Sequence, residues 1–198
     1  MIGIIDYGMG NLQSVKNALD YLHIENFISS DKDELRKADK LILPGVGAFR
    51  DAIHKVKEMQ FDDLLNEFAK NNKPILGICL GMQLFFDASV EFGNHKGLSL
   101  MEGDIVYMDV DLKVPHMGWN RLEIKKKEPL FVDLPEESYV YFVHSYHLDT
   151  KADVVSATTF YGKDLPIAAQ SGCIYALQFH PEKSGDIGLQ ILRNFANI

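Results

Sequence analysis

Lys73-Pro-Ile-Leu-Gly-Ile-Cys-Leu-Gly-Met-Gln83 is the stretch that sets the fold class of this chain. Pro74–Ile78 is a short apolar run, typical of a strand buried on both faces. Leu80–Phe86 then predicts a helix. The spacing Gly77-x-Cys79-x-Gly81 places small residues on both sides of one cysteine, as a sharp strand-to-helix turn requires. We therefore expect a nucleophile elbow with an exposed sulfur at a helix N-terminus, where the helix dipole favours the thiolate.

Composition restricts the function classes that need to be considered. The chain has 198 residues, 46% of them hydrophobic and 24% charged, and a net charge of −8, which argues against a general nucleic-acid binder. No apolar run approaches the roughly 20 residues of a membrane helix, and Met1 leads directly into an apolar strand rather than a signal peptide. The two cysteines form no disulfide framework and fit a reducing cytoplasm.

Segments on either side of the elbow indicate how the chain is organised. In the first half, apolar runs alternate with helical patterns, which indicates βαβ units and a parallel sheet. After about Glu91 the connections shorten, and we expect antiparallel strands added to the same sheet. The chain is thus predicted to be one α/β domain over residues 1–198. The predicted strands are Ile2–Asp6, Asn26–Ile28, Lys40–Leu43, Pro74–Ile78, Ile105–Val110, Asn120–Ile124, Tyr139–Val143, Val154–Thr159, Ile167–Gln170 and Ile174–Phe179.

Helices are predicted between and after these strands. Asn11 is expected to cap the first helix, which runs to about Leu22, and Ser30 or Asp31 the second, which runs to about Ala38. The others are expected near Phe49–Met59, Phe61–Asn71 and Ile187–Phe195. The pair of glycines in Tyr7-Gly-Met-Gly-Asn11 lacks the third glycine of a dinucleotide-binding turn, so we reject that interpretation.

A cysteine nucleophile needs a base, and the base needs a residue to orient it. Among seven histidines, only His180 ends a predicted core strand and has an acid two residues later, in Phe179-His-Pro-Glu-Lys-Ser184. Pro181 ends the strand, and the turn can bring Glu182 back to the imidazole. These residues predict a Cys79–His180–Glu182 triad.

Pro44-Gly-Val-Gly47 follows the strand expected beside the Cys79 strand. Ligands bind at the carboxyl ends of strands in such sheets. Backbone N–H groups of Val46 and Gly47, with the Leu80 N–H, are therefore candidates for an oxyanion hole.

Gly77-Ile-Cys-Leu-Gly-Met-Gln83 together with His180-Pro-Glu182 resembles the class I, triad-type glutamine amidotransferases. Other segments resemble, more specifically, the family of glutaminase subunits of imidazole glycerol phosphate synthase. These segments are Ile5-Asp-Tyr-Gly-Met-Gly-Asn-Leu12, Pro44-Gly-Val-Gly-Ala-Phe49, Pro115-His-Met-Gly-Trp-Asn120 and Tyr141-Phe-Val-His-Ser-Tyr146.

The resemblance implies a flavodoxin-like fold, with a central, mostly parallel sheet, added antiparallel strands and flanking helices. It also implies that Cys79 attacks the side-chain amide of glutamine, forms a thioester and releases glutamate, without a cofactor or metal. Ammonia would pass to a cyclase subunit with a (β/α)8 barrel, in a heterodimer that makes imidazole glycerol phosphate and aminoimidazole carboxamide ribotide for histidine biosynthesis. By the same resemblance, the residues that contact glutamine are Gly45, Gly47, Gln83, Glu91, Ser145 and Tyr146.

Three rival functions stay open on the sequence. The triad also suits a glutaminase serving another synthase, or a γ-glutamyl hydrolase acting alone, and the fold could serve a non-catalytic regulatory domain. His116 and Trp119 are expected to be structural or interfacial, and the sequence does not decide whether His116 or His147 touches a partner. Since Gly45 and Gly47 flank Val46, a peptide of this loop could rotate between a state that offers a carbonyl and one that offers an N–H. We take that rotation as a hypothesis for control by cyclase ligands.

Overall fold

An eight-stranded sheet runs through the middle of the computed structural model, which describes residues 1–198. The strand order is β2-β1-β3-β4-β14-β13-β12-β9. Its strands are β1 (Ile2–Ile5), β2 (Asn26–Ser29), β3 (Lys40–Gly45), β4 (Ile75–Cys79), β9 (Glu123–Ile124), β12 (Val155–Phe160), β13 (Asp164–Ser171) and β14 (Ile174–Leu177).

The first five strands of that order are parallel, and the other three are antiparallel to their neighbours. The parallel half confirms the expectation from the apolar runs: β1 and β4 are buried at every position. Such runs form central parallel strands because helices cover both of their faces.

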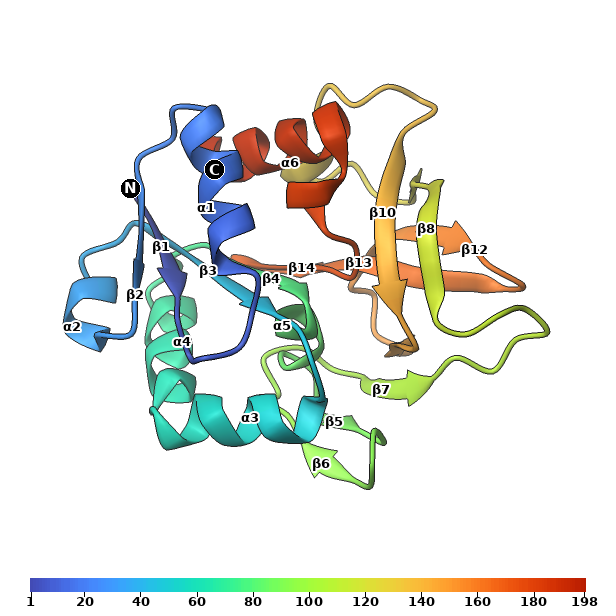
Figure 1. The fold of residues 1–198 in the computed structure, drawn as a ribbon, viewed down its shortest axis with the longest axis horizontal. Helices are drawn as coiled ribbons and strands as arrows, with labels where there is room; N and C mark the ends of the chain where they lie inside the picture. Colours follow the sequence, from blue (N-terminus) through green and yellow to red (C-terminus); the bar gives the residue numbers. More distant parts are fainter.

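Two layers of helices cover the sheet, as Figure 1 shows. On one face, α1 (Leu12–Tyr21) and α6 (Gly185–Asn197) pack side chains such as Leu19 and Phe195 into one core cluster. On the other face, Phe49 and Phe61 belong to a second cluster with the side chains of the sheet. The elements of this second layer are α2 (Lys32–Leu35), α3 (Phe49–Glu58), α4 (Phe61–Lys70) and the single turn α5 (Leu80–Gln83).

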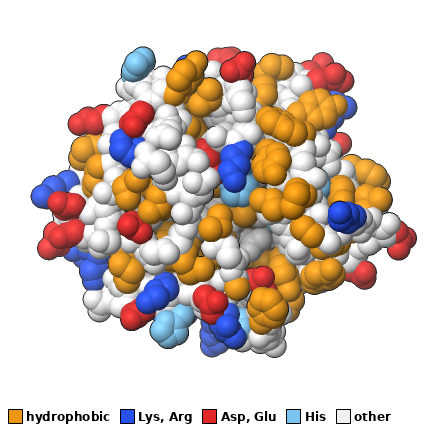
Figure 2. Space-filling model, viewed as in Figure 1, with side chains coloured by type: hydrophobic (Ala, Val, Ile, Leu, Met, Phe, Trp, Pro, Cys, Tyr) orange, Lys and Arg blue, Asp and Glu red, His pale blue; other side chains and the backbone are white.

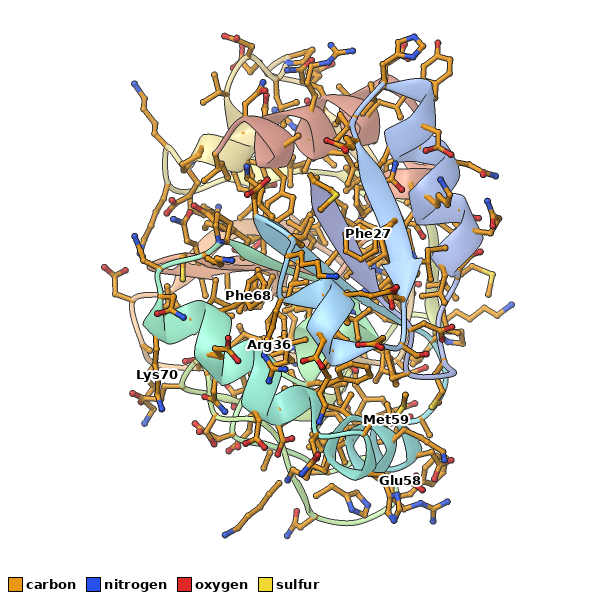
Figure 3. The ribbon with its side chains drawn as sticks, turned by 90° about the vertical axis from the view of Figure 1, so that its left-hand side faces the viewer. Phe27, Arg36, Glu58, Met59, Phe68 and Lys70 are labelled. Atoms are coloured by element: carbon orange, nitrogen blue, oxygen red, sulfur yellow. The ribbon has the colours of Figure 1, made fainter.

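Helix α4 illustrates why these segments are helical. Phe61, Leu64, Leu65 and Phe68 recur at helical spacing and are all buried. In Figure 3, Phe68 lies among the side chains under the sheet while Lys70 points away from the molecule. The apolar residues whose spacing predicted this helix are therefore the same residues that the helix buries against the sheet.

Four strands of the second half lie outside the central sheet, in addition to the short β5 (Ala88–Ser89) and β6 (His95–Lys96). β8 (His116–Arg121) pairs with β10 (Tyr139–His144), and β7 (Asp104–Tyr107) pairs with β11 (Tyr146–Asp149) and β5. The expectation that Ile105–Val110 and Tyr139–Val143 extend the central sheet is wrong. Their alternating apolar positions, such as Val140 and Phe142, pack on the core from the side. Alternation predicts one buried face and does not determine the neighbouring strand.

Other predicted elements also differ locally. The segment expected as one strand at Asn120–Ile124 is divided between β8, which pairs with β10, and β9, which pairs with β12. The helix expected over Leu80–Phe86 ends after one turn, and the N–H groups of Phe85 and Phe86 that follow bond carbonyls three residues back instead of four.

The helix caps are partly as predicted. Asp31 caps α2 by accepting from the Asp33 and Glu34 N–H groups, whereas Asn11 makes no side-chain cap at α1. Two short 3-10 turns, at Pro129–Phe131 and Pro181–Lys183, complete the fold. None of its helices is long and apolar enough to cross a lipid bilayer.

Candidate active site

Cys79 occupies a strained turn between β4 and α5. Its φ is 54° and its ψ −111°, a conformation that non-glycine residues rarely adopt. A Cβ added to Gly81 would lie 1.8 Å from the carbonyl oxygen of Leu43, and one added to Gly77 would lie 2.7 Å from the Met82 Cα. The glycines on both sides of Cys79 are therefore required by close backbone approach, as the sequence predicted. Because α5 is only one turn long, its dipole is smaller than a full helix would supply.

His180 and Glu182 form a buried pair at the end of the neighbouring strand. His180 Nδ1 lies 2.8 Å from Glu182 Oε1, and both side chains are almost completely buried. Pro181 begins the 3-10 turn that returns Glu182 to the imidazole. The turn is tied to the core because the Ser184 hydroxyl donates to the His180 carbonyl and accepts from the Tyr141 N–H.

Strand order brings this pair to Cys79. β4 and β14 are parallel neighbours, with Ile78 paired to Leu177, so both chains leave the sheet at the same edge. Burial lowers the pKa of His180, but the nearby Cys79 sulfur and Glu182 carboxylate outweigh it and raise that pKa to about 9. The site thus favours the imidazolium form of His180 beside the Cys79 sulfur.

The Val46–Gly47 loop lies on the other side of Cys79. β3 is parallel to β4 and its last residue, Gly45, is paired with Cys79. The N–H groups of Val46 and Gly47 donate no hydrogen bond within the chain, and the φ of Gly47 is 101°. Val46 and Gly47 are both exposed, so their two free N–H groups beside the Cys79 sulfur can bond an oxygen of a ligand in place of water.

A cavity of about 500 Å³ opens over the sulfur. Gly45 is buried and does not line it, and neither His180 nor Glu182 lines it. Five of the six residues expected to contact glutamine line the cavity. The lining residues are Val46, Gly47, Cys79, Leu80, Gln83, Glu91, Phe92, Tyr107, Pro115, Val143, His144, Ser145 and Tyr146.

Glu91 has a contact that the sequence did not predict. Its Oε2 accepts the N–H of Phe49 at 2.6 Å, at the start of α3. One carboxylate oxygen thus holds a helix end, while the side chain still lines the cavity. Its charge also acts on Tyr146, where burial and then Glu91 raise the pKa of the phenol.

Sequence reasoning missed Gln178, which is fully buried one strand away from Cys79. Its Nε2 lies 3.8 Å from the Cys79 Sγ, and its Oε1 accepts from Gln83 Nε2 at 2.9 Å. A signal was present, because Gln178 is the one polar amide in the apolar run Ile174–Phe179. Buried amides are kept only where they are hydrogen-bonded. His144 is a second omission, since it lines the cavity and was not assigned.

Apolar side chains surround the mouth of this cavity and continue onto the face that carries β8 and β10. Figure 2 shows hydrophobic side chains gathered on that part of the molecule. Val46, Phe92 and Tyr107 are exposed at the mouth itself. The exposed apolar side chains of β8, β10 and β12 are Met117, Trp119, Tyr139 and Phe160.

Comparisons with known proteins show which family the chain belongs to. The family model described as glutamine amidotransferase class-I matches residues 3–198. A curated protein of Geobacillus sp. (strain WCH70), named imidazole glycerol phosphate synthase subunit HisH, is 51% identical over 100% of this chain and 97% of its own length. A protein of the same name from Sulfurimonas denitrificans is 50% identical over 98% and 97%.

The solved structures give the same fold. A structure described as a glutamine amidotransferase has a TM-score of 0.77 at 21% identity and covers 100% of this chain and 99% of its own. By its sequence, the chain therefore belongs to the class-I glutamine amidotransferase family, in the group that includes the HisH subunits of imidazole glycerol phosphate synthase.

Proposed function

We propose that the chain hydrolyses glutamine to glutamate and ammonia through Cys79, His180 and Glu182. One observation supports the proposal: Cys79 lines a cavity together with two residues whose backbone N–H groups are free, and a buried imidazole–carboxylate pair lies beside Cys79. This is the set of groups that acyl transfer requires.

In the proposed reaction, the Cys79 sulfur attacks the amide carbon of glutamine as an S–C bond forms. The negative charge moves onto the amide oxygen, which the N–H groups of Val46 or Gly47 and of Leu80 stabilise. The C–N bond then breaks, and His180 gives its proton to the leaving ammonia. Water attacks the thioester carbon while His180 accepts a proton from it, the C–S bond breaks, and glutamate leaves as the Cys79 thiolate is restored. Glu182 holds the imidazole tautomer and stabilises the imidazolium throughout.

Glutamine would lie in the cavity over Cys79. Gln83, Glu91, Ser145 and Tyr146 line that cavity and are the proposed contacts. The free oxygen of Glu91 is placed to pair with the substrate ammonium, while its other oxygen is fixed by Phe49. Gly45 acts beneath the surface, because it lets the loop approach Cys79.

Ammonia is proposed to pass to a cyclase partner. The relatives are named as subunits of imidazole glycerol phosphate synthase, an enzyme of histidine biosynthesis. We propose that this chain forms a heterodimer with the cyclase subunit through the face that carries the cavity mouth, where Val46, Phe92 and Tyr107 are exposed. Exposed apolar patches of this kind mark protein–protein interfaces. We place its action in the cytoplasm, because both cysteines are free thiols.

A glutamate-release assay with and without the cyclase tests the proposal. The expected result is slow release by the chain alone, faster release in the complex, and co-elution of the two proteins as a 1:1 complex in size-exclusion chromatography. Full activity without any partner would favour a stand-alone γ-glutamyl hydrolase. No glutamate release with the cyclase and its substrate present would favour a regulatory domain.

A further inference from the structure

A buried series of hydrogen bonds connects β8 to Cys79. It has two branches, which meet at one backbone atom, the carbonyl oxygen of Tyr146. One branch leads outward through two histidines and the other leads inward through two glutamines. Its members, in order, are Asn120, His116, His144, Tyr146, Gln83, Gln178 and Cys79.

The outer branch has a single possible direction. A backbone carbonyl can only accept, so His144 Nδ1, at 2.8 Å from the Tyr146 oxygen, must carry a proton. In the neutral ring, His144 Nε2 is then an acceptor, and His116 Nδ1 at 3.0 Å must donate to it. His116 Nε2 is left as an acceptor, and it faces the amide nitrogen of Asn120 at 3.4 Å.

Both histidine rings are neutral, as this scheme requires. His116 is stacked between Phe142 and Tyr161, with ring centroids 4.6 and 4.0 Å away. Burial lowers the pKa of His116 to about 4 and is the main cause that lowers that of His144 to about 3. Each ring therefore holds one proton, at a nitrogen that its neighbour determines.

The inner branch is fixed by the same carbonyl. Gln83 Nε2 donates to the Tyr146 oxygen at 3.4 Å and to Gln178 Oε1 at 2.9 Å. Because Gln178 must present its oxygen to Gln83, its NH2 group is turned toward Cys79, where Nε2 lies 3.8 Å from Sγ. Reversing the Gln178 amide would place two NH2 groups against each other and an oxygen against the sulfur.

We propose that Gln178 is a further catalytic residue, whose N–H donates to the Cys79 thiolate, and that His116 and His144 are positioning residues that hold the Tyr146 carbonyl for this purpose. The inference rests on the proposed glutaminase function. A thiolate accepts a charge-assisted hydrogen bond, whereas the thioester sulfur carries no charge. The Gln178 donor therefore stabilises the nucleophile before attack and the leaving sulfur when water releases glutamate.

The first test measures the sulfur directly, in the cyclase complex and without glutamine. Iodoacetamide alkylation is measured at a pH below the apparent pKa of the Cys79 thiol, which a pH series on the wild-type complex gives first, and it is followed by mass spectrometry of the peptide that carries Cys79. Gln178→Met keeps the length of the side chain but has no donor, and alkylation is expected to slow about tenfold. Gln178→Glu keeps the shape and puts an acceptor at the sulfur, and it should slow alkylation further.

Gln170→Met is the matched control, because Gln170 lies on adjacent β13 and its Nε2 bonds the Gly172 carbonyl. In Gln170→Met, Cys79 should be alkylated at the wild-type rate. Wild-type rates in both Gln178 variants would overturn the proposal. If Gln178→Met does not fold, Gln178→Glu decides the question alone.

The second test separates positioning from packing. Asparagine carries its amide nitrogen at the same number of bonds from Cα as His Nδ1, so His144→Asn can keep the donor to Tyr146, whereas His144→Leu cannot. We expect His144→Leu to slow Cys79 alkylation about threefold and His144→Asn to restore most of the rate. His147→Leu is the control. His147 is as buried as His144, but its ring bonds the Leu148 carbonyl and takes no part in the series of hydrogen bonds that leads to Cys79. Equal rates in His144→Leu and His144→Asn would overturn the role of the histidines.

The readout distinguishes this inference from the function on which it rests. Alkylation needs no glutamine, so slow alkylation in Gln178→Met supports the donor even if no glutamate is released by the wild-type complex. Absence of glutamate release by the wild-type complex would overturn the glutaminase proposal alone. Normal glutamate release with unchanged alkylation in every variant would overturn the present inference alone.

Discussion

Gly45 and Cys79 are register partners at the carboxyl ends of two neighbouring parallel strands. A Cβ on Gly45 would lie 2.6 Å from the Tyr7 hydroxyl and 2.7 Å from the Gly81 nitrogen. The absence of that Cβ lets the Val46–Gly47 loop lie against the elbow. Cys79, the proposed nucleophile, and the proposed oxyanion donors are thus set side by side by strand register.

Gly81→Ala should destabilise the protein by about 3 kcal/mol or more, because the new Cβ meets the Leu43 carbonyl and both partners are backbone. Denaturant unfolding measures the change. Gly172→Ala is the control: its φ is 56° with open space around it, so only a backbone penalty of about 1–2 kcal/mol is expected. Equal losses in the two variants would show that the close approach at Gly81 is not what requires glycine.

Cys79→Ala should abolish glutamine hydrolysis and leave the fold intact. The substitution removes the sulfur and little volume, and the protein should still bind its cyclase. In the complex, the cyclase reaction should continue when free ammonia is supplied, because that chemistry does not use the thiol. Glutamate release by this variant would refute the assignment of Cys79.

His180→Asn should lower turnover by roughly 10⁴, and Glu182→Gln by less, since the base is lost in the first case and only its orientation in the second. Steady-state kinetics of the complex gives both values. Two mild and equal reductions would contradict the roles proposed for the buried pair.

Acid should destabilise the protein through His116 and His144. Their pKa values are lowered to about 4 and about 3 in the fold, against about 6.5 in the unfolded chain. Their contribution is therefore complete above about pH 6.5 and is lost as the pH falls toward 4. His180 adds nothing to this slope, since its raised pKa keeps it protonated in both states below about 6.5.

The free energy of unfolding should fall by at most about 1.4 kcal/mol per pH unit for each of these two histidines. Urea unfolding at several pH values measures the slope. In His116→Asn, the slope of the unfolding free energy against pH should be smaller by the contribution of one histidine. A slope that is unchanged in this variant would mean that His116 is not held neutral.

Gly47→Ala should blunt the activation of the glutaminase by cyclase ligands. The φ of Gly47 is 101°, which alanine rarely adopts, and the new Cβ would also lie 3.0 Å from the Met9 Cε. If one oxyanion donor is switched by loop rotation, a cyclase substrate analogue should raise wild-type turnover about a hundredfold. A rise of the same size in Gly47→Ala would move the switch to another part of the molecule.

The sequence by itself determined the local features. Apolar runs indicated the parallel strands, glycine spacing indicated the elbow at Cys79, and His180-Pro-Glu182 indicated a turn that closes on itself. Each depends on residues that are near one another in the chain, so steric and hydrogen-bonding rules for short segments were sufficient.

Tertiary structure alone decided which sheet the later strands join and which polar side chains meet. The alternating pattern of β10 predicts that one face of the strand is buried. It does not determine whether the strand pairs with β8 or lies at the edge of the central sheet. Gln83 and Gln178 come from α5 and from just beyond β14, and they meet because β4 and β14 are neighbours. Hydrogen bonds between such residues depend on strand order, which is set by burial of the whole chain rather than by any short segment.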